Sequence, residues 1–177
     1  MSRGGKHRVV SLRDVADGLS AKYYPNRDDS HGLTLRGFKG SGTGGYITEC
    51  CKLPSRDVGD VFLGAYEWGM PHGPKEFATN WQGFILIRTQ HKNTQHLDLG
   101  YSSVLHFLRV RPDYIISRFG ESGLDIIYRR KWHIEIRQNE FLIHRPNRWL
   151  FHSDFTNVIE DAVTVCEAYR SPEAGTA

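Results

Sequence analysis

Two histidines and a glutamate in the second half of the chain are spaced so that they could bind a metal ion. A two-residue turn at 138–139 would pair the flanking residues as a β-hairpin. His133 then faces His144, and Glu135 lies two residues along the same face, opposite Leu142. Two imidazoles and a carboxylate suit zinc or another divalent metal. The alternative is a sheet face of mixed polar residues without an ion, and Leu142 on that face favours this alternative and partial burial.

Other candidate ligands and nucleophiles carry weaker signals. His91 and His96 flank a polar loop segment, where histidines are more often exposed to solvent than bound to a metal, and Asp98 lies nearby. Cys50 and Cys51 are adjacent, so on a strand they point to opposite faces, and we expect one in the core and the other outside it. No signature of a catalytic serine or cysteine is present, so the sequence leaves enzymatic activity open.

A basic and aromatic segment precedes the predicted hairpin, and it could contact nucleic acid. It spans 128–149, begins at Tyr128, and has Arg129, Arg130, Lys131 and Trp132 as the proposed contact residues. Arginines that contact phosphates and aromatic rings that stack on bases would suit single-stranded nucleic acid. The alternative is a solvated rim whose long side chains cover aromatic surface. The isoelectric point of about 8.8 is lower than dedicated nucleic-acid domains usually show.

A glycine-rich loop contains Gly40, Gly42 and Gly45 in the pattern G-x-G-x-x-G. In dinucleotide-binding proteins this pattern is followed by a helix whose N-terminus holds the pyrophosphate. Here the following segment, 46–53, has the β-branched and aromatic composition of a strand. We therefore predict a hairpin connection and no nucleotide site.

Amphipathic helices are predicted at both ends of the chain. Apolar residues at helical spacing between 11 and 23 predict the first, with Ser11 and Asp14 as a capping box and Pro25 as the stop. A stripe between 153 and 169 predicts the last helix, capped by Ser153 or Asp154. The stripes consist of Leu12, Val15, Leu19 and Tyr23 in the first helix, and of Phe155, Val158, Ile159, Ala162, Cys166 and Tyr169 in the last.

Between these helices the hydrophobic period is mostly two, which predicts strands. The predicted strands cover 33–38, 45–53, 60–70 and 77–89, with a short strand at the end of the polar connection 91–103 and the hairpin around 138–139. The segment 105–119 fits either a strand or a helix, and Pro112 interrupts a helix there. The fold class is therefore α+β, with antiparallel sheet or sheets of about six to eight strands. We expect one domain over 1–177, with two lobes, 8–100 and 101–170, as the alternative.

Composition places the chain among globular proteins. Its 177 residues are 39% hydrophobic and 24% charged, and the net charge of +3 permits nucleic acid or anionic lipid without arguing for either. The longest apolar run, 84–87, is far shorter than a membrane span, and the first residues lack a secretory signal. The 3 cysteines are an odd number without C-x-x-C. Reduced thiols and a cytoplasmic location are therefore expected.

The order of segments resembles that of a family of uncharacterised bacterial proteins, a domain of unknown function often found beside membrane segments. The resemblance covers roughly 11–170 and rests on the pattern of segments, including a strand that ends in "HRP" followed by an acidic-capped helix. It implies the same α+β fold and a bacterial source. No activity, cofactor or site residue comes with it.

Three hypotheses for function follow from these patterns. The first is a binding module for another protein, in which exposed aromatic side chains such as Trp68 and Trp81 form the contact surface. The second is a metal-binding protein or metal-dependent enzyme that uses His133, Glu135 and His144. The third is a nucleic-acid binder that uses the basic and aromatic segment. A divalent metal is the one cofactor that the sequence suggests.

Overall fold

The computed structural model describes residues 9–25, 33, 35, 38, 45–54, 56–72, 76–90, 96–100, 113–145 and 148–169. The helices are α1 (Leu12–Gly18), α3 (Asp113–Arg130) and α4 (Phe155–Ala168). The strands are β1 (Lys22–Tyr24), β2 (Tyr46–Lys52), β3 (Asp60–His72), β4 (Glu76–Arg88), β5 (Leu97–Leu99), β6 (His133–Arg137) and β7 (Glu140–His144). The predicted α+β class with an antiparallel sheet between terminal helices is confirmed.

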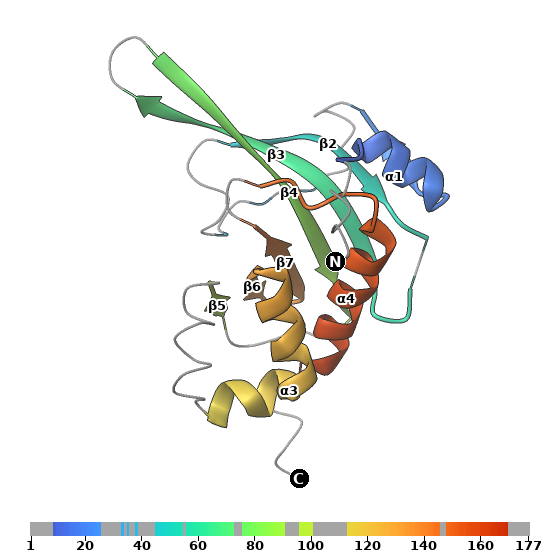
Figure 1. Cartoon of the computed structure of the whole chain (residues 1–177), viewed down its shortest axis with the longest axis vertical. Coiled ribbons are helices and arrows are strands. Elements are labelled where there is room, and N and C mark those ends of the chain that lie inside the picture. Colours follow the sequence, from blue (N-terminus) through green and yellow to red (C-terminus); the bar gives the residue numbers. More distant parts are fainter. Residues whose placement is uncertain are drawn as a thin grey trace, which may run out of the picture.

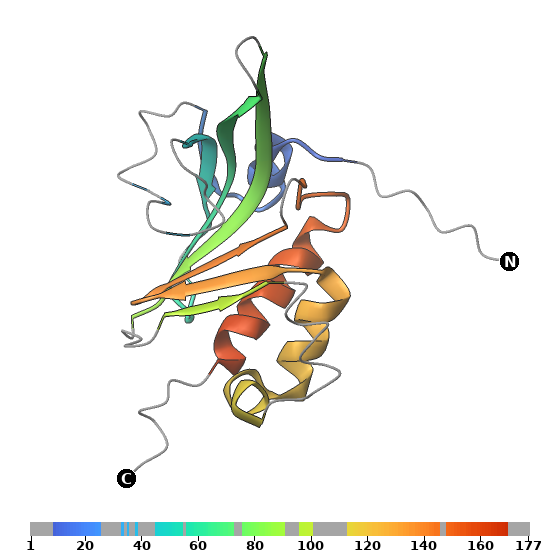
Figure 2. The same cartoon turned by 90° about the vertical axis from the view of Figure 1, so that its left-hand side faces the viewer.

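The strands form one antiparallel sheet in the order β1-β2-β3-β4-β7-β6-β5. β4 pairs with β7 from Phe84 opposite His144 to Arg88 opposite Glu140, so the two halves of the chain share this sheet. β3 and β4 form a long hairpin that extends beyond the other strands (Figure 1). The three helices lie on the same side of the sheet (Figure 2).

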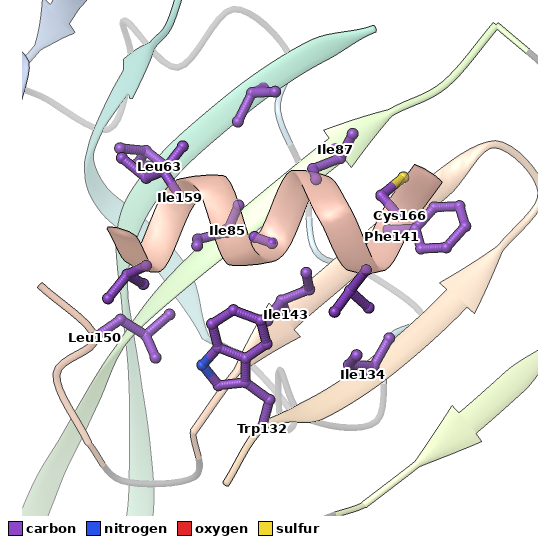
Figure 3. Packing of buried hydrophobic residues seen from close by; sticks show 14 of the residues in the cluster. Leu63, Ile85, Ile87, Trp132, Ile134, Phe141, Ile143, Leu150, Ile159 and Cys166 are labelled. Carbon is purple, nitrogen blue, oxygen red and sulfur yellow. The ribbon is translucent and has the colours of Figure 1, made fainter. Parts of the chain in front are cut away.

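Apolar side chains cover both faces of the central strands. The helix-side core fills the space between the sheet and the helices (Figure 3). A second cluster, the opposite-face core, lies on the other face of the sheet. The helix-side core includes Leu63, Ile85, Ile87, Trp132, Ile134, Phe141, Ile143, Leu150, Ile159 and Cys166. The opposite-face core consists of Tyr24, Leu33, Leu35, Phe38, Ile47, Cys50, Phe62, Tyr66, Phe84, Leu86 and Leu142.

The two adjacent cysteines point to opposite faces, as predicted, but the expectation that one lies outside the core is wrong. Cys51 belongs to the helix-side core and Cys50 to the opposite-face core, and both are buried. The error arose because alternation along a strand separates two faces but does not say whether both are covered. Burial raises the pKa of the Cys51 thiol to about 12, which keeps it protonated and unreactive.

The first helix is shorter than predicted. The Ser11 hydroxyl accepts a hydrogen bond from the Asp14 amide and donates one to the Asp14 carboxylate, so the predicted cap is present. The helix ends at Gly18, and Ser20 has a φ of 52°, which turns the chain into β1. Tyr23, assigned by its spacing to the helix, lies on β1 and hydrogen-bonds to Glu49.

Residues 113–119 of the ambiguous segment 105–119 form the start of helix α3, and its earlier residues lie outside the described part of the chain. Gly120 has a φ of 64° and breaks the helix into two parts. Lys131, with a φ of 57°, ends the helix, and the Lys131 and Trp132 amides donate to the carbonyls of Tyr128 and Ile127. This turn places the Trp132 side chain in the helix-side core and lets β6 begin at once.

Helix α4 begins after Asp154, and the Asp154 side chain, one of the two predicted caps, makes no capping hydrogen bond. The Asp154 carboxylate instead accepts a hydrogen bond of 3.0 Å from Arg130, and Asp161 accepts one of 2.7 Å from the same guanidinium. These contacts tie the end of α3 to α4. The pKa of Arg130 is raised: desolvation opposes the charge, and the hydrogen bonds to the two carboxylates outweigh it.

The hairpin of β6 and β7 has the predicted register, including Ile134 opposite Ile143 and Ile136 opposite Phe141. Gln138 has a φ of 48°, which a tight hairpin turn requires at its first central position. The Asn139 carbonyl accepts a hydrogen bond of 2.8 Å from the amide of Thr89, just beyond β4. The turn is thereby joined to the neighbouring strand, which fixes the hairpin within the sheet.

The predicted strand 33–38 is not found at the positions that the structure describes. Leu33, Leu35 and Phe38 lie outside the strands and are buried in the opposite-face core. Their alternation therefore reflects packing against the sheet. In the glycine-rich loop, Gly40 and Gly42 lie outside the described residues, and the predicted strand, β2, follows Gly45.

Candidate metal centre

His133, Glu135 and His144 lie together on the sheet face opposite the helices. His133 and Glu135 are on β6, and His144 is on β7 directly opposite His133. On the same face, Leu142 pairs with Glu135 and Phe84 pairs with His144, and both belong to the opposite-face core. The rings of the two histidines stack with centroids 4.7 Å apart and planes 20° apart. The structure thus brings together the constellation that the sequence predicted.

The potential ligand atoms converge on the carboxylate of Glu135. Its Oε1 lies 3.6 Å from Nε2 of His144 and 4.0 Å from Nε2 of His133. One donor atom from each of the three residues lies within 4.8 Å of the others. Tetrahedral zinc with bonds of about 2.0–2.1 Å holds its donors about 3.3–3.4 Å apart. The side chains would have to rotate out of the stacked arrangement to bring these atoms to that spacing.

Burial at this centre is more complete than Leu142 suggested. Glu135 is 0% exposed and His144 is 1% exposed. Neither ring nitrogen of His144 has a hydrogen-bond partner among the described residues, because the 3.6 Å contact with Glu135 is too long for one. A buried polar atom without a partner costs about 1–3 kcal/mol. A metal ion that binds the lone pair of one ring nitrogen would remove this cost for that atom.

Desolvation lowers the pKa of His144, and the neighbouring His133 acts in the same direction, although the Glu135 carboxylate opposes both. The lowered pKa keeps His144 in its neutral form. Neutral imidazole is the form that binds metal ions, so the electrostatics of the site favour a ligand role for this side chain.

Asp98 joins the site from the edge strand. β5 pairs with β6 so that Asp98 is opposite Glu135. The Asp98 carboxylate oxygen Oδ1 lies 2.6 Å from Nε2 of His133, and the two side chains are 22% and 20% exposed. The sequence placed Asp98 near His96 and assigned it no role, because the pairing of β5 with β6 joins residues far apart in the chain. His96 itself is exposed, and His91 lies outside the described residues.

The four residues proposed for nucleic-acid binding do not share an exposed face. Trp132 is 1% exposed and belongs to the helix-side core, so its ring is not available for stacking on a base. Arg130 bonds to Asp154 and Asp161, and the mostly exposed Arg129 also pairs with Asp161. The expectation that Trp132 stacks on bases is therefore corrected, because the end of α3 directs this ring inward.

The aromatic surface proposed for protein binding lies largely outside the side chains that the structure describes. Trp68 and Trp81 are on the extended part of the β3–β4 hairpin, and the backbone is described there without the side chains. Elsewhere in the described part of the chain the exposed large hydrophobic residues are Val9, Tyr46 and Tyr128. Single exposed residues of this kind do not form a patch.

Comparisons of this chain with protein-family models, with curated proteins and with solved structures find no match. Within the described residues, no helix combines the length and apolar character needed to cross a membrane. The site must therefore be interpreted from its own geometry.

Proposed function

We propose that this protein binds a divalent transition metal ion, zinc being the best fit, through His133, Glu135 and His144. The observation that carries the proposal is the convergence of three suitable donor atoms at a buried position, where the His144 nitrogens have no hydrogen-bond partner among the residues that the structure describes. Imidazole and carboxylate ligands on three side chains are typical of zinc sites.

The charges at the site also favour a cation. Glu135 is completely buried, and an ionised carboxylate in that position is costly unless it is paired or coordinates a metal. A divalent ion would compensate the carboxylate and occupy the lone pairs of both imidazoles.

The test is metal analysis of the untagged protein, followed by zinc titration after chelator treatment. We expect one ion per chain in the wild type and an affinity at least about 100-fold weaker in His133→Ala, since loss of an outer partner alone costs 10–100-fold. His96→Ala, which removes an exposed histidine outside the site, is the matched control and should bind as the wild type does. Equal affinity of wild type and His133→Ala would overturn the proposal.

A further inference from the structure

We infer that Asp98 supplies a fourth ligand, so that the bound ion ties the edge strand β5 to the β6–β7 hairpin and occupies a closed site without a position for substrate. This inference rests on the proposed metal binding. It goes beyond that proposal by adding a ligand from a third strand and by assigning the site a structural role.

One nitrogen atom of His133 faces two carboxylates. Nε2 of His133 lies 2.6 Å from Oδ1 of Asp98 and 4.0 Å from Oε1 of Glu135. The Glu135 carboxylate also faces Nε2 of His144, at 3.6 Å. An ion held by Glu135 and both histidines therefore uses the same Nε2 atom of His133 that now contacts Asp98.

A neutral imidazole nitrogen has one lone pair or one proton, not both. Once Nε2 of His133 binds an ion it has no proton to share with Asp98, so their hydrogen bond is lost. The Asp98 carboxylate is then left beside a divalent cation. Its distance from Nε2 must grow from 2.6 Å to the spacing of about 3.3–3.4 Å between zinc ligands, which a rotation of the side chain provides.

Charge balance favours the same arrangement. Two neutral imidazoles, two carboxylates and a divalent ion have no net charge, which suits a site where Glu135 and His144 are buried. Asp98 and His133 are the partly exposed members, at 22% and 20%. The ion can therefore enter between these two side chains, and Asp98 closes the site after it.

Four protein ligands are typical of structural zinc sites, whereas catalytic sites keep one position for water or substrate. β5 has only three residues, and within the described part of the chain it pairs with β6 alone. A coordinate bond from Asp98 would thus add a strong contact to a short edge strand. The ion is expected to hold β5 in the sheet.

The experiment compares Co²⁺ binding by the chelator-treated wild type, Asp98→Asn and Asp98→Glu. Tetrahedral Co²⁺ has characteristic visible absorption bands that depend on its ligands. We expect Asp98→Asn to bind Co²⁺ about 100-fold more weakly than the wild type and with altered bands, and Asp98→Glu to recover part of the affinity. Asp17→Asn, which changes an exposed aspartate on α1, should match the wild type.

Hydrogen exchange provides the readout of the strand. Added Zn²⁺ should slow amide exchange of β5 in the wild type by tenfold or more and leave it unchanged in Asp98→Asn. Wild-type bands and affinity in Asp98→Asn would overturn the fourth ligand while leaving metal binding intact. Altered affinity with unchanged bands would also overturn it, because Asp98 would then only orient His133. Absence of Co²⁺ binding by the wild type would instead overturn the proposed function.

Discussion

At the scale of residues, the β6–β7 hairpin buries two ionisable side chains, Glu135 and His144. Glu135 and His144 are enclosed by apolar neighbours such as Leu142 and Phe84. Folding must therefore remove a carboxylate and an imidazole from water, which is costly without compensation. In the proposed function the ion provides that compensation, and the metal-free protein should show the cost directly.

The lowered pKa of His144 predicts how the stability of the metal-free protein depends on pH. Below its ordinary value of 6.5, the unfolded chain binds a proton that the folded chain resists. The free energy of unfolding should therefore fall as pH decreases from 6.5 towards the lower pKa of the folded state. One group contributes a slope of at most about 1.4 kcal/mol per pH unit.

Urea unfolding between pH 7.5 and 5 in the presence of chelator measures this effect. His133, Glu135 and Asp98 also act electrostatically on this imidazole, so the informative quantity is the difference in the free energy of unfolding between wild type and His144→Gln. That difference should change with pH below 6.5. Parallel profiles for the wild type and His144→Gln would contradict the predicted role of burial.

At the scale of elements, patterns in the sequence predicted the features that depend on residues close together in the chain. The β6–β7 register followed from a two-residue turn and alternation, and it placed His133 opposite His144 correctly. Helix α3 was not predicted because Gly120 interrupts it and Pro112 precedes it, so the sequence shows no continuous stripe of apolar residues at helical spacing. Tyr23 was misassigned because helical spacing alone cannot detect that Ser20 has already turned the chain.

The fourth residue of the site could not be found from local patterns. Asp98 and His133 are separated by 35 positions, and only the pairing of β5 with β6 brings them together. Alternation shows which residues share a face of one strand, but it does not show which strands are neighbours. The burial of both sheet faces was also hidden, because Leu33, Leu35 and Phe38 cover the second face without forming a strand.

The pairing of β3 with β4 predicts a steric requirement at Gly64. Gly64 is opposite Phe84, and a Cβ at this position would lie 2.4 Å from the Phe84 ring. Gly64→Ala should therefore destabilise the protein by about 1–3 kcal/mol, the usual cost of overpacking a core. Chemical denaturation of the purified variant measures the loss.

A double-mutant cycle identifies the source of the strain at Gly64. Phe84→Leu alone should be destabilising. In Gly64→Ala/Phe84→Leu the loss in the free energy of unfolding should be smaller than the sum of the two single losses, since the smaller side chain makes room for the methyl group. A coupling energy of about 0.5–3 kcal/mol is typical of residues in contact. Strict additivity would show that the ring does not cause the effect.

At the scale of the whole molecule, the sheet joins both halves of the chain. Helices α1, α3 and α4 cover one face, and the opposite-face core covers the other (Figure 2). β4 from the first half and β7 from the second half are neighbours at the centre of the sheet. The expectation of a single domain, against that of two lobes, can therefore be tested at the β4–β7 pairing.

Substitution at this junction should destabilise both halves equally. Ile143 on β7 is the register partner of Ile85 on β4, and both are 0% exposed. Ile143→Val removes one methyl group and should cost about 0.5–1.5 kcal/mol. In a single cooperative domain, native-state hydrogen exchange of the slowest amides in β2–β4 and in β6–β7 should report the same loss. If the slowest amides of β2–β4 kept their protection while those of β6–β7 lost it, the chain would consist of two lobes. The control is Glu167→Gln, at an exposed position of α4, which should leave the protection of both sets of amides unchanged.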